Sequence, residues 1–329
     1  MIQRLAYIDS LRGLSIILII ALHSRLTIVN TEVNRMFLNM ELPAFFFISG
    51  LFFKRYSSFR QFIIKKVNNL IVPYLFFSYI PFCLLSYFFT DSYSDISFYI
   101  LAPIKPYNTP LWFVRCLFFT FLLYYFIDKF TEKKSILLPM SVIAILVLVT
   151  CLVNVKYQEL KEVNSILSEF SFIINDILTS FISLPYFFIA QQIKKRGWLE
   201  FKINWKLTTL LVSIAIAIAY IFKQGNFVYY YALYGDNVLF GYISSLSSIF
   251  AFGLLFAKLK HTGVFQLFGK YSLIVLGCHY VSIIILKTFF WPPSYLVFII
   301  TFLLMIPCIY FFKHFFPKFT AQEELFRFH

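Results

Sequence analysis

Residues 7–29 read YIDSLRGLSIILIIALHSRLTIV, an apolar segment that carries two ionisable side chains of particular interest, Arg12 and His23. The eleven-residue step between them is about three turns of an α-helix, so both side chains fall on one helix face. An ionisable residue at membrane depth is costly unless it faces a cavity or a partner. Two such residues on one stripe therefore predict a polar track through a bilayer, of the kind used for chemistry or transport.

The composition of the chain is that of an integral membrane protein. Of 329 residues, 60% are hydrophobic and 13% are charged, and the mean hydropathy is +0.79, whereas a soluble domain is about half apolar and a quarter charged. The net charge of +14 comes from basic residues scattered through short gaps between apolar runs. Anionic lipid headgroups account for that pattern, and it argues against nucleic-acid binding. The five cysteines are isolated, so we expect neither a metal site nor a disulfide framework.

Ten apolar runs predict membrane-spanning helices. We place them at 8–29, 36–53, 70–89, 111–127, 136–153, 173–193, 206–222, 239–257, 272–290 and 294–312. Most Lys and Arg residues fall in alternate gaps and at the two ends of the chain, so these regions are predicted to be cytoplasmic. We therefore expect an all-α polytopic bundle of about ten spans with both termini inside. It would form one membrane domain over residues 1–329, with no separate soluble domain.

Ionisable residues inside the first span are the leading candidates for chemistry. The imidazole of His23 can accept and return a proton near neutral pH, as acyl transfer to a hydroxyl requires; the alternative is a core histidine bonded to a helix carbonyl. Arg12, near the cytoplasmic face, can grip a phosphorylated donor through its guanidinium fork. Asp9 lies one turn earlier and would orient Arg12. The alternatives are a simple Asp9–Arg12 pair, or snorkelling of Arg12 to headgroups.

The orientation of the spans places further ionisable side chains in the same part of the membrane. Arg115, about one turn into the fourth span, would stabilise an oxyanion or hold a sugar acceptor; the alternative is a salt bridge to Glu41 or Asp176. Glu41, at the start of the second span, lies at the predicted depth of His23. His279 lies about two turns into the ninth span, and its pattern fits a core position as well as a substrate site.

These residues resemble the signature of the acyltransferase-3 membrane family. The resemblance begins with Arg12, ten intervening residues and His23, on a first span that opens YIDSLRG. Three further stretches are similar in the same order: LPAFFFISGL at 42–51, PLWF at 110–113 and GKYSLIVLGCH at 269–279. Within the first of these, Ser49-Gly50 predicts a close helix crossing. The likeness covers the chain from end to end and is nearest to the fucose 4-O-acetylase and exopolysaccharide O-acetylase members.

The resemblance implies transfer of an acyl group, usually acetyl, from cytoplasmic acetyl-CoA to a hydroxyl of a surface-polysaccharide or lipid-linked sugar in the bacterial inner membrane. The residues assigned are, for catalysis, His23 and Arg115; for the donor, Arg12, Asp9, Lys65 and Lys66; and for the acceptor, Glu41, Trp112 and His279. General-base catalysis by His23 and a covalent acyl-histidine both stay open. Where some members carry a serine-x-glutamate element, this chain has Val114-Arg115-Cys116, so Arg115 is read as a subfamily alternative.

The expected partners are acyl-CoA, a sugar or polysaccharide acceptor and membrane lipids, without nucleic acid or metal; a homo-oligomer is left open. The main competing hypothesis is a secondary transporter or polysaccharide flippase with an intramembrane His/Arg relay. Such transporters often show inverted repeats and broken spans, and no such symmetry is visible in this sequence. A purely structural membrane scaffold is the third reading.

Overall fold

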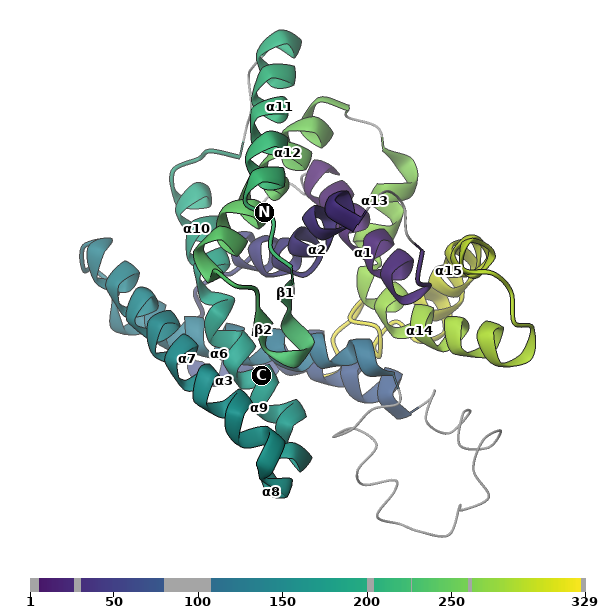
Figure 1. Ribbon diagram of the computed structural model, residues 1–329, viewed down its shortest axis with the longest axis horizontal. Coiled ribbons are helices and arrows are strands. Elements are labelled where there is room, and N and C mark those ends of the chain that lie inside the picture. The colour runs from purple at the N-terminus through teal and green to yellow at the C-terminus, as the bar shows by residue number, and fades with distance from the viewer. Residues whose placement is uncertain are drawn as a thin grey trace. The chain divides into compact units, whose positions relative to one another are not determined.

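The computed structural model describes residues 6–26, 31–79, 108–199, 204–225, 227–259 and 262–326 (Figure 1), without the side chains of residues 31, 32 and 227. The chain divides into two compact units. Unit 1 comprises Met1–Ile19, Thr27–Lys54 and Phe119–Lys270, and unit 2 comprises Ile20–Leu26, Arg55–Phe118 and Tyr271–His329. The single domain expected from the sequence stays a prediction.

Unit 1 is built mainly from helices, with one short hairpin. Its elements are α2 (Thr31–Leu51), α7 (Leu137–Val163), α8 (Ser165–Glu169), α9 (Ser171–Ile182), α10 (Leu184–Lys195), α11 (Trp205–Ile221), β1 (Phe227–Val228), the 3-10 turn Tyr229–Tyr231, β2 (Leu233–Tyr234), α12 (Val238–Leu259) and α13 (Gly263–Lys270). Unit 2 contains α3 (Phe59–Lys66), the π-helix Val67–Ile71, a helix over 72–79, the 3-10 turn Thr109–Leu111, α14 (Ser272–Phe289) and α15 (Ser294–Phe315). Two helices, α1 (Ala6–His23) and α6 (Trp112–Phe130), contribute residues to both units.

Seven helices among the described residues are long and apolar enough to cross a membrane. They are α1, Thr109–Phe130 with α6, α7, Ser171–Lys195 with α9 and α10, α12, α14 and α15, and each falls on a predicted span. Of the other three predicted spans, 206–222 is the 17-residue apolar helix α11. Residues 36–51 lie in the less apolar helix α2, and the run 70–89 is described only as far as residue 79. The all-α polytopic bundle is confirmed, while the cytoplasmic termini stay a prediction.

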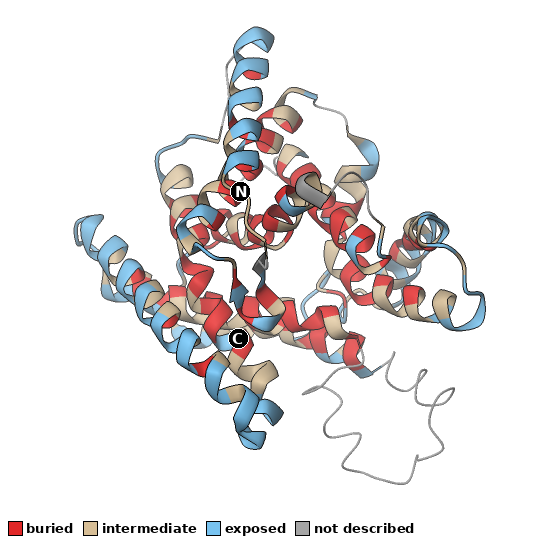
Figure 2. Cartoon of the chain, viewed as in Figure 1, coloured by how far each residue is buried: buried red, intermediate tan, exposed pale blue. Residues whose placement is uncertain are grey.

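Several of the most apolar helices expose most of their length (Figure 2). In the most apolar windows of α7 and α15, only 11% and 22% of the residues are buried within the protein. Leu152 of α7 and Leu303 of α15 are both more than half exposed. Because water penalises exposed apolar side chains of this density and lipid does not, these faces are the ones that contact the bilayer.

Glycines let the helices of unit 1 cross with their backbones in contact. A Cβ atom on Gly50 of α2 would lie 2.7 Å from the Cα of Phe187 in α10, closer than real Cβ atoms approach. The close crossing predicted at Ser49-Gly50 is therefore confirmed. In the same way a Cβ on Gly13 of α1 would overlap the carbonyl of Phe265 in α13, and one on Gly269 would overlap the carbonyl of Asp9. Gly13, the residue directly after Arg12, is thus itself a close packing contact between α1 and α13.

The β-hairpin of unit 1 is held on α7 and α9 by side-chain amides and a hydroxyl. Its strands pair antiparallel, with Phe227 opposite Tyr234. Thr179 Oγ1 donates to the carbonyl of Tyr229 at 2.9 Å, and Asn175 Nδ2 donates to that of Tyr230 at 3.0 Å. These bonds tie the 3-10 turn between the two strands to α9.

Candidate active site

His23 is the last helical residue of α1, which corrects the predicted end of the first span at residue 29. The amide of Arg25 donates to the carbonyl of Leu22, and the amide of Leu26 donates to that of Ala21, both at 2.9 Å. With Arg25 at φ 59°, this is the Schellman arrangement that terminates helices. Lys287 Nζ of α14 lies 3.2 Å from the His23 carbonyl and donates to it, so the helix end is capped within unit 2.

A second histidine, His279 of α14, is hydrogen-bonded to His23. The Nδ1 atom of His279 lies 3.0 Å from the carbonyl oxygens of Val275 and Leu276 in the same helix. A carbonyl oxygen can only accept, so this Nδ1 carries the proton, and Nε2 of the neutral ring carries the lone pair. His23 Nδ1 lies 3.2 Å from that Nε2 and therefore donates to it. The lone pair of neutral His23 is then on its own Nε2.

The packing around this pair fixes the position of His279, whose side chain is fully buried. Gly277 leaves room for the ring of Phe77, which any Cβ at that position would overlap. Asn108 Nδ2 donates to the Gly277 carbonyl at 2.7 Å. The Tyr280 ring lies edge-on to His23, with centroids 5.3 Å apart. The imidazole of His23 is itself only half-buried, so within unit 2 the pair has one fixed member and one accessible member.

Three buried polar atoms of the same unit have no hydrogen-bond partner among the described residues. They are the hydroxyls of Ser24 and Thr301 and the Oδ1 atom of Asn108. Buried polar atoms are nearly always paired, by protein or by a bound molecule. Sequence reasoning did not select any of these three residues, nor Lys287 and Tyr280. Small polar residues beside or within apolar runs carry no signal that distinguishes these positions from ordinary helix positions.

Arg115 and Trp112 lie in the first two turns of α6, within unit 2. The Nη1 atom of Arg115 donates to the Tyr74 hydroxyl at 3.2 Å, and its guanidinium carbon lies 5.7 Å from the Tyr74 ring centre. Trp112 is buried. The alternative salt bridge of Arg115 with Glu41 or Asp176 stays a prediction, because both acids belong to unit 1. The guanidinium thus contacts both the hydroxyl and the ring of Tyr74.

The residues assigned to the donor are found in both units. In unit 1, Arg12 is half-buried with its guanidinium carbon 5.8 Å from the Phe52 ring centre, and Asp9 is buried. The helical rise places His23 about 16 Å along α1 from Arg12. In unit 2, Lys65 is paired with Glu324 and Lys66 is buried beside the rings of Tyr56 and Phe62. A role for the two lysines in binding the donor stays a prediction.

Glu41, assigned to the acceptor, is buried in α2 of unit 1, and its Oε2 atom has no hydrogen-bond partner among the described residues. The structure thus brings together two of the predicted residues directly, His23 and His279. It places Arg115 and Trp112 in the same unit as that pair. Asp9, Arg12 and Glu41 belong to unit 1, and their relation to the histidines stays a prediction.

The chain is thus a polytopic helical protein in which two histidines, His23 and His279, are hydrogen-bonded to each other at the end of the first span. The family model described as acyltransferase domain, acyltransferase 3, matches residues 5–314. The chain therefore belongs to the acyltransferase-3 family and is a membrane acyltransferase. The curated proteins gave no match to the chain, and the solved structures gave none either.

Proposed function

We propose that this protein is an O-acetyltransferase of the bacterial inner membrane. It would move an acetyl group from cytoplasmic acetyl-CoA to a hydroxyl of a surface-polysaccharide or lipid-linked sugar. The observation that supports this most directly is the hydrogen bond from His23 Nδ1 to His279 Nε2 at 3.2 Å. It gives the partly exposed imidazole a single neutral tautomer whose basic nitrogen, Nε2, is directed away from its buried partner.

The chemistry needs one base that later serves as an acid. His23 Nε2 takes the proton of the acceptor hydroxyl while that oxygen attacks the thioester carbonyl carbon. The tetrahedral intermediate collapses, the carbon–sulfur bond breaks, and the departing thiolate receives the proton from His23. The products are an acetyl ester and free coenzyme A, and the imidazole is neutral again. His279 is a positioning residue in this scheme, because it touches His23 and not the substrate.

Two arginines would handle negative charge at separate steps. The guanidinium of Arg115 is positioned by Tyr74 and is always charged, so it would stabilise the oxyanion of the intermediate. Arg12 would bind phosphate oxygens of coenzyme A through its guanidinium fork. The rise along α1 between Arg12 and His23 is about 16 Å. This is comparable to the length of an extended pantetheine arm, the thin chain that joins the phosphates of coenzyme A to the thioester.

The test of this function measures O-acetylation in cells that lack the chromosomal gene and carry variants on a plasmid. His23→Ala should lower the initial rate of O-acetylation of surface polysaccharide by about 10²–10⁴-fold. The rate is followed as the growth of the O-acetyl signal in proton NMR spectra. His314→Ala is the matched control, because His314 is an exposed histidine at the end of α15 in the same unit. Full acetylation by His23→Ala would contradict the proposal. If rapid quench traps a labelled acyl-enzyme, the reaction proceeds through a covalent acyl-histidine and not by general-base catalysis.

The role of His279 needs a readout that a merely structural residue would not move. His279→Gln retains an amide oxygen that can accept from His23 Nδ1, whereas His279→Leu retains no acceptor. We expect the glutamine variant to recover much of kcat and the leucine variant to lose it, with KM for acetyl-CoA unchanged in both. Equal losses in the two variants, or a loss confined to KM, would contradict the positioning role.

A further inference from the structure

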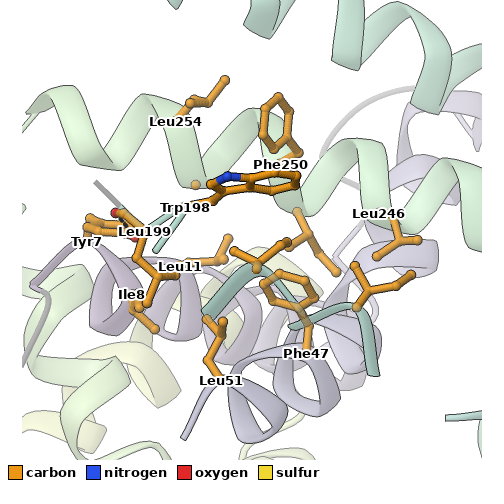
Figure 3. Close-up of a pocket in the computed structure, with 14 residues that line it drawn as sticks. Tyr7, Ile8, Leu11, Phe47, Leu51, Trp198, Leu199, Leu246, Phe250 and Leu254 are labelled. Carbon is orange, nitrogen blue, oxygen red and sulfur yellow. Dashed lines mark hydrogen bonds between the residues drawn. The ribbon is translucent and has the colours of Figure 1, made fainter. Parts of the chain in front are cut away.

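Unit 1 contains a cavity of about 390 Å³, within the range of about 300–1,000 Å³ typical of ligand sites. Apolar side chains of α1, α2, α10 and α12 line it, together with the turn after α10 (Figure 3). Tyr7, at its edge, donates its hydroxyl to the carbonyl of Leu199 at 2.7 Å, which fastens that turn to α1. None of the lining residues is assigned to acyl transfer.

The turn that completes the cavity follows from a helix stop in the sequence. Gly197 adopts φ 71°, and its amide donates to the Lys194 carbonyl at 3.1 Å. The amide of Trp198 donates to the Ile193 carbonyl at 3.0 Å. These two bonds form a Schellman motif, which brings together the residues on either side of the glycine. Ile193 and Trp198 accordingly both line the cavity.

One cation of this turn lies at the cavity edge. Lys194 donates to the carbonyl of Phe53 at 2.9 Å, and Lys195 lies 3.7 Å from a carboxylate oxygen of Asp128. Arg196 is exposed, and its guanidinium carbon lies 4.9 Å from the centre of the Trp198 ring. The end of α10 falls on the side predicted to be cytoplasmic, where the inner leaflet is rich in anionic lipid.

Two residues that line the cavity are also exposed at the surface of unit 1. Trp198 and Phe250, which line it, are 56% and 45% exposed. Phe250 belongs to α12, one of the candidate membrane spans. An apolar cavity with an exposed arginine at its edge and a wall on a membrane span matches a phospholipid in both charge and polarity. We propose that it binds an acyl chain of an anionic glycerophospholipid of the inner leaflet, with the phosphate on Arg196.

Gly253 of α12 allows this proposal to be tested without disturbing the packing. It lines the cavity, and a Cβ built on it meets no atom within 4 Å. Gly253→Leu should therefore fill the cavity and weaken binding of palmitoyl-oleoyl phosphatidylglycerol by at least about tenfold, the effect of losing about two buried methylenes. Binding is read by native mass spectrometry of the detergent-purified protein during a lipid titration. Gly263→Leu is the control, because that glycine also faces open space but does not line the cavity.

The charge is tested separately, with variants that alter only exposed side chains. The wild type should bind phosphatidylglycerol more tightly than phosphatidylcholine with the same chains. Arg196→Gln should remove that difference, whereas Lys134→Gln, which neutralises an exposed lysine outside the turn, should keep it. The proposal is overturned if the two lipids bind equally to the wild type, or if Gly253→Leu binds phosphatidylglycerol normally. If palmitoyl-CoA at equal concentration displaces the lipid, the lipid-binding proposal is overturned and the cavity is instead a site for the acyl donor.

Discussion

Replacing Gly13 by alanine should destabilise the protein, whereas the same replacement at Gly253 should stabilise it. A Cβ at Gly13 would overlap the backbone carbonyl of Phe265, which cannot rotate away as a side chain would, while a Cβ at Gly253 meets open space. Alanine gains about 1 kcal/mol over glycine in a helix, and overpacking costs about 1–3 kcal/mol. Because the overlap at Gly13 involves rigid backbone, we take the upper end of that range. The net change is then a loss of about 2 kcal/mol at Gly13 and a gain of up to about 1 kcal/mol at Gly253.

The assay is the apparent Tm of both variants and the wild type in one detergent, at one heating rate because unfolding of large proteins is commonly irreversible. A change of 1 kcal/mol shifts Tm by about 2–4 °C in domains somewhat smaller than this chain. We expect Gly13→Ala to melt about 4 °C below the wild type and Gly253→Ala about 2 °C above it. The reasoning is refuted if Gly13→Ala melts at or above the wild type, or if both variants fall together.

Three further predictions concern charged side chains. Burial, with the nearby Lys65 charge, lowers the pKa of Lys66 from 10.5 to about 7; the unfolded chain keeps this proton to higher pH, so the free energy of unfolding should rise from pH 7 towards pH 10. Lys66→Met should remove that rise in a pH series of melting curves, and an unchanged series would contradict the shift. Lys287→Met removes the donor to the His23 carbonyl and should cost about 1 kcal/mol of stability; an unchanged Tm would count against the cap. Arg12→Lys loses the guanidinium fork and should raise KM for acetyl-CoA with Tm unchanged, whereas an unaltered KM would remove Arg12 from the donor site.

The helices could be predicted from the sequence because length and apolarity are local properties. The end of α1 could not. The apolar run continues to Val29, whereas the helix ends after His23 because Arg25 adopts the left-handed conformation. A glycine at that position would have predicted this conformation, but an arginine does not. Gly197, by contrast, is a recognisable helix stop at the end of the basic run that closes α10.

The sequence identified the residues of the candidate site but not the contacts between them. His23 and His279 were both selected as ionisable residues inside spans, but they are 256 residues apart, and only the fold shows that they share a hydrogen bond. Lys65 and Lys66 read in sequence as part of an open basic loop. The structure pairs the first with Glu324 and buries the second, because the chain near its end packs on this segment, where Asn68 Nδ2 donates to the carbonyl of Phe326 at 2.7 Å.

The stop at the end of α1 has a consequence for how this segment can vary. Gly13, near the middle of α1, packs against Phe265, and the backbone bonds of Arg25 and Leu26 fix the end of the helix at His23. Each residue added to a helix turns everything beyond it by about 100°. A single inserted or deleted codon between these points would swing the imidazole to another side of the helix. Natural variants of this segment should therefore carry substitutions but neither insertions nor deletions.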